Sequence, residues 1–436
     1  STVIASQRTN SIKLSQDMSS RWTEIRQASA LSHPGFRLLW TATLLSSTAR
    51  WADLVVVGWL TLELTDSALM VGIVSGCKMA GYIFAPVMGV AADRMNRRKL
   101  LILASVVSGT IALLMLILLL TGKMMIGYLI ALSLISSLTW ALDHPTRQAF
   151  IPDLVGQKNL TNAIALNAVA TETTVIIGPT LGGLLIPIFG ISGAYVLIVV
   201  IYLFDLLALL RLKKQAPQQA QSSPSTQLPE ATRTHTTPLT SLLDGFKYAW
   251  GNQAVLMLLL IACMLNFFVA PYRYSFLPLL ARYVLDTGPT GYGLLTSMAG
   301  VGALVAGLWV VSLGNYSQRG RLVILGGLLW PISIFLLSLS SWFYLSMLIV
   351  FVAGIAQAIS WTLIATLILS NTETSMRGRV MGLRTGVVIS LPFGNFLAGA
   401  IAENFGVAVA MAIYASCALL LMLLIISRAP ILRQLK

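Results

Sequence analysis

The chain has 436 residues, of which 56% are hydrophobic and only 10% are charged, whereas charged residues make up about 25% of a soluble domain. This composition excludes an ordinary soluble protein and indicates that most of the surface faces lipid. The formal net charge of +14 leaves two interpretations, a nucleic-acid-binding protein or a membrane protein with basic loops on one side.

Twelve long apolar runs follow one another along the chain, each near the roughly 20 residues that cross a bilayer. They lie at 36–63, 68–91, 99–121, 125–147, 160–187, 190–212, 253–284, 290–314, 321–340, 343–370, 376–404 and 406–427. Between the sixth and seventh runs, 213–238 is rich in Gln, Ser, Thr and Pro, which is typical of a solvated linker. An amphipathic stretch at 239–250 then leads into the seventh run.

These runs predict an all-α integral membrane protein with twelve transmembrane helices in two pseudo-symmetric six-helix halves. The expected domains are a tail at 1–35, a first half at 36–212, the linker at 213–238, a second half with its amphipathic lead-in at 239–428, and a tail at 429–436. In carriers built from paired repeats, the substrate site lies between the repeats near the bilayer midplane.

The basic residues gather on one side of this predicted topology. If the N-terminus is cytoplasmic, most of the 29 Lys and Arg residues fall in cytoplasmic loops and tails, and the opposite loops hold almost only Lys123. Because positive charge favours the cytoplasmic side, both termini are expected there. The topology accounts for the net charge, so no nucleic-acid partner is expected.

Residue types that could support catalysis are scattered. The three histidines share no local motif, and the three cysteines lie in separate apolar runs at spacings unlike a metal site. The sequence contains neither a nucleophile elbow nor a phosphate loop. We therefore expect neither an enzyme nor a cofactor or metal site, while a receptor that does not transport stays open as an alternative.

A charged loop separates the second and third runs. It reads Gly89-Val-Ala-Ala-Asp93-Arg94-Met-Asn-Arg97-Arg98-Lys99 and resembles the major facilitator superfamily signature G-x-x-x-D-R-x-G-R-R, with Asn96 in place of the second glycine. The resemblance implies the major facilitator fold and a loop that latches the halves in one conformation. Gly89, Asp93, Arg94 and Arg98 are therefore gating candidates, and a simple positive-inside loop is the alternative. The corresponding loop at 314–321 lacks the acid.

Further segments resemble the enterobactin-exporter and macrolide-efflux branch of the superfamily. They begin at Pro145, Pro152, Asn162, Gly178 and Arg377. The Gly178-Pro179-x-x-Gly-Gly element also resembles the core of the antiporter signature. The resemblance implies export by proton antiport across a bacterial inner membrane, with the proton gradient as driving force and Gly178, Pro179, Arg377 and Arg379 in gating roles. Multidrug efflux and transport of lipid or another solute remain alternatives.

Charged residues in the first half lie near the predicted midplane, where each costs at least a few kcal/mol. Arg50 and Asp53 share a helical face and could pair with each other or with Lys78. One interpretation is an ion-pair cluster, and the other is that Asp53 changes its protonation as the carrier switches access. Glu172 is the other candidate for proton coupling, or for substrate contact, with a buried partnered glutamate as the alternative. Asp143 and Arg147, near His144 and Asp205, are expected to form structural or gating pairs.

In the second half, Arg273 and Arg384 lack an acidic neighbour near the midplane. Among six midplane charges, four are positive, and this surplus of two favours an anionic, siderophore-like substrate with aromatic or amphiphilic parts. The expected cavity residues are Arg50, Lys78, Arg273, Arg384, Tyr272, Tyr274, Asn266, Asn395, Gln357 and Trp361. The expected partners are membrane lipids and this small molecule, and we expect a monomer.

Overall fold

A computed structural model describes residues 30–84, 88, 95–212, 238–312, 318–429, 432, 433 and 435. Within these ranges the regular structure is helical, as the sequence predicts. The first half comprises α2 (Pro34–Thr65), α3 (Ala68–Met79) with the 3₁₀ turn η2 (Ala80–Phe84), α5 (Arg97–Leu120), α6 (Ile126–Val155) and α7 (Leu160–Arg211). The second half comprises α8 (Pro238–Gly251), α9 (Gln253–Met264), α10 (Leu277–Tyr283), α11 (Gly288–Ser312), α12 (Arg319–Ser338), α13 (Phe343–Ser370), α14 (Arg377–Val387), α15 (Ser390–Phe405) and α16 (Val407–Arg428).

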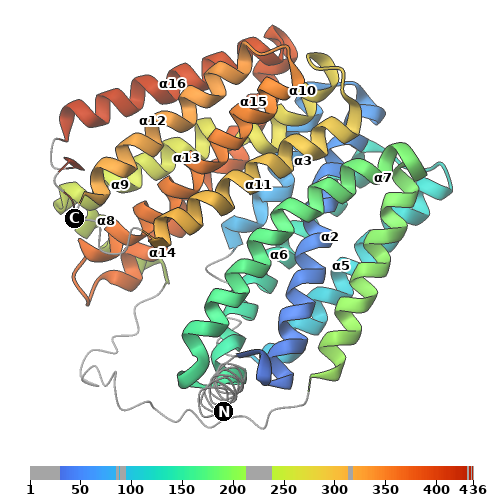
Figure 1. The fold of residues 1–436 in the computed structure, drawn as a ribbon, viewed down its shortest axis with the longest axis horizontal. Coiled ribbons are helices and arrows are strands. Elements are labelled where there is room, and N and C mark those ends of the chain that lie inside the picture. Colours follow the sequence, from blue (N-terminus) through green and yellow to red (C-terminus); the bar gives the residue numbers. More distant parts are fainter. Residues whose placement is uncertain are drawn as a thin grey trace, which may run out of the picture.

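The described helices account for twelve membrane crossings. Nine helical stretches in the described part of the chain are long and apolar enough to cross a bilayer. One of them contains two predicted spans, because α7 turns at the non-helical Gly190, whose φ is 71°. The remaining two crossings are the shorter apolar stretch Ala68–Phe84 and α2, which carries Arg50 and Asp53 near its middle. Twelve crossings in two groups agree with the major facilitator fold that the sequence resemblance implies (Figure 1).

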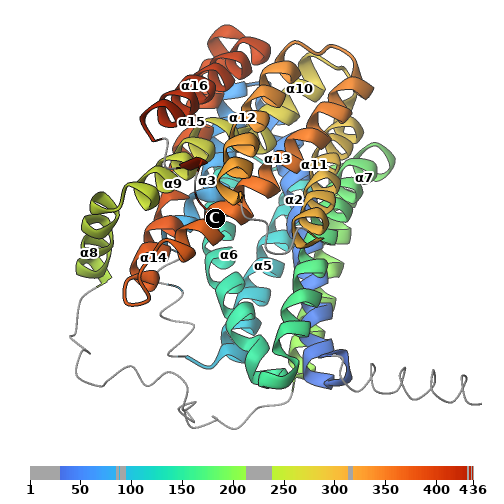
Figure 2. The ribbon, with the colours of Figure 1, turned by 60° about the vertical axis from the view of Figure 1, so that its left-hand side comes forward.

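The two halves touch through four glycines that allow backbones to approach closely. An added Cβ on Gly72 of α3 would lie 2.8 Å from the Cα of Gly399 of α15, and one on Gly183 of α7 would lie 2.8 Å from the Cα of Gly293 of α11. These contacts relate α3 and α15 in the same way as α7 and α11. Figures 1 and 2 show the first half as a blue and green group beside the yellow and red second half.

Polar contacts close the end of the molecule that is farther from the termini. The carboxylate of Asp66, after α2, accepts a hydrogen bond from Arg282 at 2.9 Å and from the hydroxyl of Tyr283 at 3.0 Å. Glu403 of α15 accepts from the backbone N–H of Leu69 at 3.0 Å and from the hydroxyl of Ser67 at 3.1 Å. Each half therefore supplies one acid to this contact.

Two helices of the second half depart from regular α-helix near the middle of the membrane. The seventh crossing contains two π-helical segments, η6 (Leu265–Val269) and η7 (Tyr272–Phe276), on either side of Pro271. The eleventh crossing is divided between α14 and α15 at Val388 and Ile389. Such π segments occur frequently at functional sites, and the second of them, η7, carries Arg273.

Candidate transport cavity

Two adjoining cavities lie between the glycine contacts and the end that bears the termini. The first has a volume of about 180 Å³ and is lined mainly by the first half, with Tyr274 from the second half. The second has a volume of about 630 Å³ and is lined by both halves, which is within the range of roughly 300–1,000 Å³ for small-molecule sites. They share Tyr82, Trp140 and His144.

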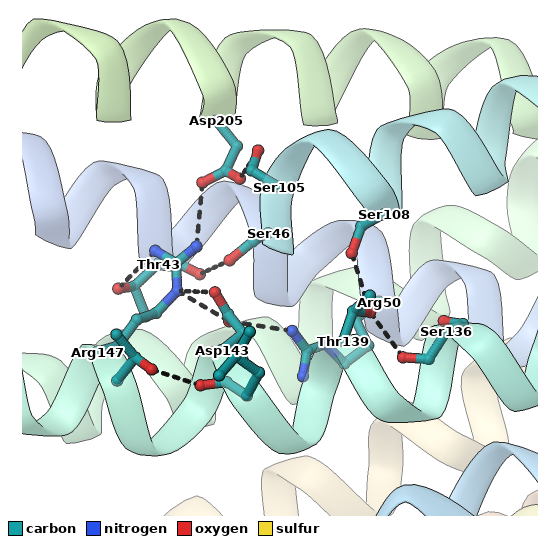
Figure 3. A network of polar contacts seen from close by, with 12 residues as sticks. Thr43, Ser46, Arg50, Ser105, Ser108, Ser136, Thr139, Asp143, Arg147 and Asp205 are labelled. Carbon is teal, nitrogen blue, oxygen red and sulfur yellow. Dashed lines mark hydrogen bonds and ion pairs between the residues drawn. The ribbon is translucent and has the colours of Figure 1, made fainter. Parts of the chain in front are cut away.

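A buried ion-pair network forms one wall of the first cavity (Figure 3). The Nε of Arg147 donates to both carboxylate oxygens of Asp143 at 2.9 Å, and its Nη2 donates to Asp205 at 3.3 Å. Asp205 also accepts from Ser105 at 2.6 Å. Arg50 donates to Asp143 at 3.2 Å. The network joins α2, α5, α6 and α7. Asp143 and Arg147 pair as the sequence indicated, but the acidic partner of Arg50 is Asp143 rather than Asp53.

Asp53 is held in a separate cluster. Its carboxylate forms an ion pair with Lys78 at the end of α3, and it accepts a hydrogen bond from the hydroxyl of Tyr195 at 2.9 Å. The cluster therefore links α2, α3 and α7, and one of the two pairings expected for Asp53 is confirmed. Lys78 also lines the first cavity.

Arg273 is buried, and no described residue forms an ion pair with it. The guanidinium carbon of Arg273 lies 5.5 Å from the ring centre of Trp51, which belongs to the first half. The residue is 5% exposed, and its Nε and Nη2 have no hydrogen-bond partner among the described residues. A buried donor left unpaired costs about 1–3 kcal/mol, so this guanidinium is suited to an acceptor that arrives with a substrate.

Two further residues bear on the charge of the site. Arg384 of α14 is half-buried in the wall of the second cavity, and none of the ion pairs between described residues includes it. Glu172 of α7 is half-buried, and the positive charge of Arg273 acts on it across the interface between the halves. Among the described residues, Arg273 therefore forms no ion pair with an acid of either half, although its charge reaches Glu172 of the first half.

The predicted charge surplus needs correction. Because Asp143, Arg147 and Asp205 join the same polar region, the basic side chains are Arg50, Lys78, Arg147, Arg273 and Arg384, and the acidic ones are Asp53, Asp143, Glu172 and Asp205. The excess is one positive charge rather than two. Asp143 and Arg147 were not among the six midplane charges because they lie near the inner end of the fourth predicted span.

The other predicted cavity residues divide into two groups. Tyr274 lines the first cavity, and Asn266 and Trp361 line the second. Asn266 is buried, and its Oδ1 lacks a partner in the described part of the chain.

The second group does not line either cavity. The hydroxyl of Tyr272 donates to Gln357 at 3.5 Å, and both residues are buried. Asn395 is a correction, because it is fully buried, accepts from Ser275 at 2.6 Å and donates to the carbonyl of Leu391 at 3.0 Å. These hydrogen bonds join Asn395 to neighbouring residues of the second half, so its amide group does not face a cavity.

Sequence reasoning missed the aromatic side of the cavities. Tyr82 and Trp140 meet edge to face with ring centres 4.3 Å apart, and the guanidinium carbon of Arg50 lies 5.5 Å from the ring centre of Trp140. His144 stacks on the same indole at 5.5 Å. The available signal was that Tyr82 and Trp140 each lie within four residues of a charged residue in an apolar run, Lys78 and Asp143 respectively.

The predicted gating residues have different surroundings. An added Cβ on Gly178 would lie 2.5 Å from the Cβ of Trp51, and the carbonyl of Pro179 lies against Gly293 of the other half. Arg98 donates to the carbonyl of Leu210 at 2.9 Å. Gly89, Asp93 and Arg94 lie outside the described residues.

At the start of α14, both predicted gating arginines contact their own half. Arg377 donates to the carbonyl of Thr372 at 3.3 Å, and Arg379 pairs with Asp244 at 3.1 Å.

Comparisons with known proteins agree with this geometry. The profile of a family described as transmembrane secretion effector matches residues 25–435. An enterobactin exporter of Shigella boydii serotype 18 is 29% identical over 360 residues, which cover 81% of this chain and 82% of the relative. The enterobactin exporter of Escherichia coli O81 is 28% identical with the same coverage.

Solved structures resemble this fold at low sequence identity. A POT family transporter in complex with 5-aminolevulinic acid has a TM-score of 0.73 at 12% identity, covering 92% of this chain and 97% of that one. The nucleoside transporter NupG has a TM-score of 0.71 at 12% identity, covering 90% of this chain and 98% of that one. At this identity the likeness establishes the fold alone.

Proposed function

The chain belongs to the transmembrane secretion effector family, and on this premise we propose that it exports a small anionic or amphiphilic molecule by alternating access. It is a multi-pass secondary transporter of the major facilitator superfamily, not an enzyme. The similarity to enterobactin exporters supports export and a bacterial inner-membrane location.

The observation that carries the proposal is the contrast between the basic residues of the two halves. Arg50, Lys78 and Arg147 each have an acidic partner within 4 Å, whereas the described residues provide no ion pair to Arg273 or Arg384. A negative group on the substrate would supply the missing partner, and charge-assisted hydrogen bonds are the stronger kind.

Aromatic side chains suit the remainder of such a substrate. Tyr82 and Trp140 belong to both cavities, Trp51 to the first and Trp361 to the second, and their faces can stack on flat rings. A siderophore-like molecule with catecholate or carboxylate groups combines the two requirements. Multidrug efflux of cations is the alternative, and the unpaired arginines disfavour it.

Glu172 has a defined electrostatic role in this scheme. Its carboxylate and a substrate anion are both attracted by Arg273, so they compete for the same positive charge. Protonation of Glu172 removes the competitor and strengthens anion binding. This effect on affinity is the opposite of what proton antiport requires, because in antiport the binding of a proton must release the substrate. We therefore assign Glu172 to substrate affinity.

We assign proton coupling to Asp53. Its protonation breaks the ion pair with Lys78, which ties the end of α3 to α2, and α3 also packs against the second half through Gly72. A proton on Asp53 can thereby alter the contact between the halves without occupying the substrate site. In proteoliposomes, Asp53→Asn should retain substrate exchange but lose its dependence on a pH gradient.

We further propose that the structure represents an inward-facing carrier. The end opposite the termini is closed by the contacts of Asp66 and Glu403, and the cavities lie toward the termini. With both termini cytoplasmic, as the basic loops indicate, the cavity is accessible from the cytoplasm.

The cargo can be sought with a measurement that assumes no particular compound. Compounds secreted by cells with and without the gene are compared by untargeted mass spectrometry. Anionic aromatic compounds should be depleted from the medium of the deletion strain and restored by the gene. Depletion of cationic compounds alone would replace this proposal with multidrug efflux.

A further inference from the structure

The helix α8 is too short to cross the membrane and is separated from the crossing that follows it. Its 14 residues extend about 21 Å at 1.5 Å per residue, against a hydrocarbon core of roughly 30 Å. The backbone is extended at Asn252, whose φ is −112° and ψ is 97°, and the Asn252 side chain caps α9. In Figure 2, α8 lies at the margin of the second half beside α9 and α14.

One side of α8 is fastened to the second half. Asp244 pairs with Arg379 of α14 at 3.1 Å. The hydroxyl of Tyr248 accepts from the backbone N–H of Glu373 at 3.2 Å. An added Cβ on Gly245 would lie 3.0 Å from the carbonyl oxygen of Arg379. This side is therefore a packed protein contact.

The other side of α8 is apolar and exposed. Leu243, Phe246 and Trp250 are 62%, 52% and 69% exposed, and the rings of Phe246 and Trp250 lie 5.8 Å apart. Their spacing of three, four and seven residues places them on one helical face. Lys247, also exposed, follows Phe246 at the edge of this face, where a lysine can extend its amine toward water.

We propose that this face of α8 is inserted in the phospholipid headgroup layer on the side of the membrane that bears the termini. Short helices with an apolar face, a basic edge residue and an aromatic anchor bind at this depth, and tryptophan is enriched at the membrane interface. Because α14 carries Arg384 to the second cavity, α8 connects the lipid surface to a wall of that cavity through Asp244 and Arg379.

The test places a spin label on Phe246→Cys in the full-length chain, with Cys77, Cys263 and Cys417 replaced by Ser, in phosphatidylglycerol and phosphatidylethanolamine vesicles. Ser375→Cys is the control, because it is an exposed loop residue at the same end. The measurement is the collision rate with oxygen, which concentrates in lipid, and with a water-soluble nickel chelate. It needs no transported cargo, so its outcome is independent of the proposed function.

The Phe246→Cys label should collide with oxygen at least about threefold more often than the control label, and with nickel correspondingly less often, as expected for an interfacial helix. Equal nickel collision at both positions would place α8 in water and overturn the proposal. Protection from both reagents would indicate a protein partner and also overturn it. Leu243→Cys, on the same face, repeats the test if the first variant does not fold.

Discussion

Asp66 of the first half and Arg282 of the second form an ion pair with 2.9 Å between Oδ1 and Nη2, at the end where the halves are closed. Their side chains are 68% and 32% exposed. An exposed pair contributes about 0–1 kcal/mol, so this contact adjusts an equilibrium between conformations that the buried glycine contacts largely determine.

The first prediction concerns this ion pair. Arg282→Gln should increase the ratio of molecules open at this end to molecules closed there by no more than about fivefold, the equivalent of 1 kcal/mol. Single-molecule Förster resonance energy transfer between dyes attached to the two halves measures this ratio. Arg428→Gln removes an exposed arginine from the end of α16 and should leave it unchanged. A complete conversion to the open form by Arg282→Gln would show that the ion pair is the main latch.

The second prediction concerns the contact of α7 with α11. Gly293→Ala places a Cβ 2.5 Å from the carbonyl oxygen of Pro179, and such overpacking costs about 1–3 kcal/mol. It should therefore open this end more than Arg282→Gln does in the same assay. Gly307→Ala is the matched control, because an added Cβ there has no neighbour within 4 Å among the described residues. Equal behaviour of the two alanine variants would contradict the assigned role of Gly293.

The third prediction concerns the buried network. Arg147→Met leaves Asp143 and Asp205 without their shared cation, and removing one partner of a buried pair costs about 3–5 kcal/mol. The variant should therefore unfold at a clearly lower temperature in detergent. Arg97→Met breaks a pair with Asp153 whose side chains are 28% and 34% exposed, so its effect should be small. Similar unfolding temperatures for both variants would argue against a stabilising role for the network.

The sequence predicted the architecture well because lipid imposes it. Apolar runs of spanning length, one polar linker and one-sided basic loops are each visible in the sequence, and the twelve crossings follow from them. Local irregularities were not visible. The π segments around Pro271 depend on how the second half packs, and the division between α14 and α15 falls at Val388 and Ile389, two apolar residues that do not indicate a break by themselves.

The sequence predicted which charged residues belong to the candidate site, but it did not predict which of them form ion pairs with each other. A charged residue within an apolar run is evident from sequence, but its partner depends on how helices are placed around one another. Asp53 and Lys78 are separated by 25 positions, and Arg50 and Asp143 by 93, so neither pair could be selected over its alternatives. The face on which Asn395 lies was likewise settled only by its contact with Ser275.

The fourth prediction tests the competition at Arg273. In the wild type, affinity for an anionic substrate should fall as pH rises through the titration of Glu172, because the deprotonated carboxylate opposes the anion. Glu172→Gln imitates the protonated acid and should bind the anion tightly at every pH. Binding is measured by quenching of intrinsic tryptophan fluorescence with 2,3-dihydroxybenzoate as the probe, because its carboxylate stays ionised over the pH range used. A pH dependence that is the same in the wild type and in Glu172→Gln would remove Glu172 from the site.

The fifth prediction is that Arg273 and Arg384 bind a negative group of the exported molecule. It is tested by the initial rate of uptake into proteoliposomes of the aromatic anion 2,3-dihydroxybenzoate and of the cation tetraphenylphosphonium, for the wild type, Arg273→Gln and Arg384→Gln. The wild type should take up the anion saturably, and each variant should lose about tenfold or more of this rate, since a lost charge-assisted hydrogen bond is worth about 1.5–3 kcal/mol. Transport of the cation alone, or equal uptake of the anion by all three proteins, would contradict it.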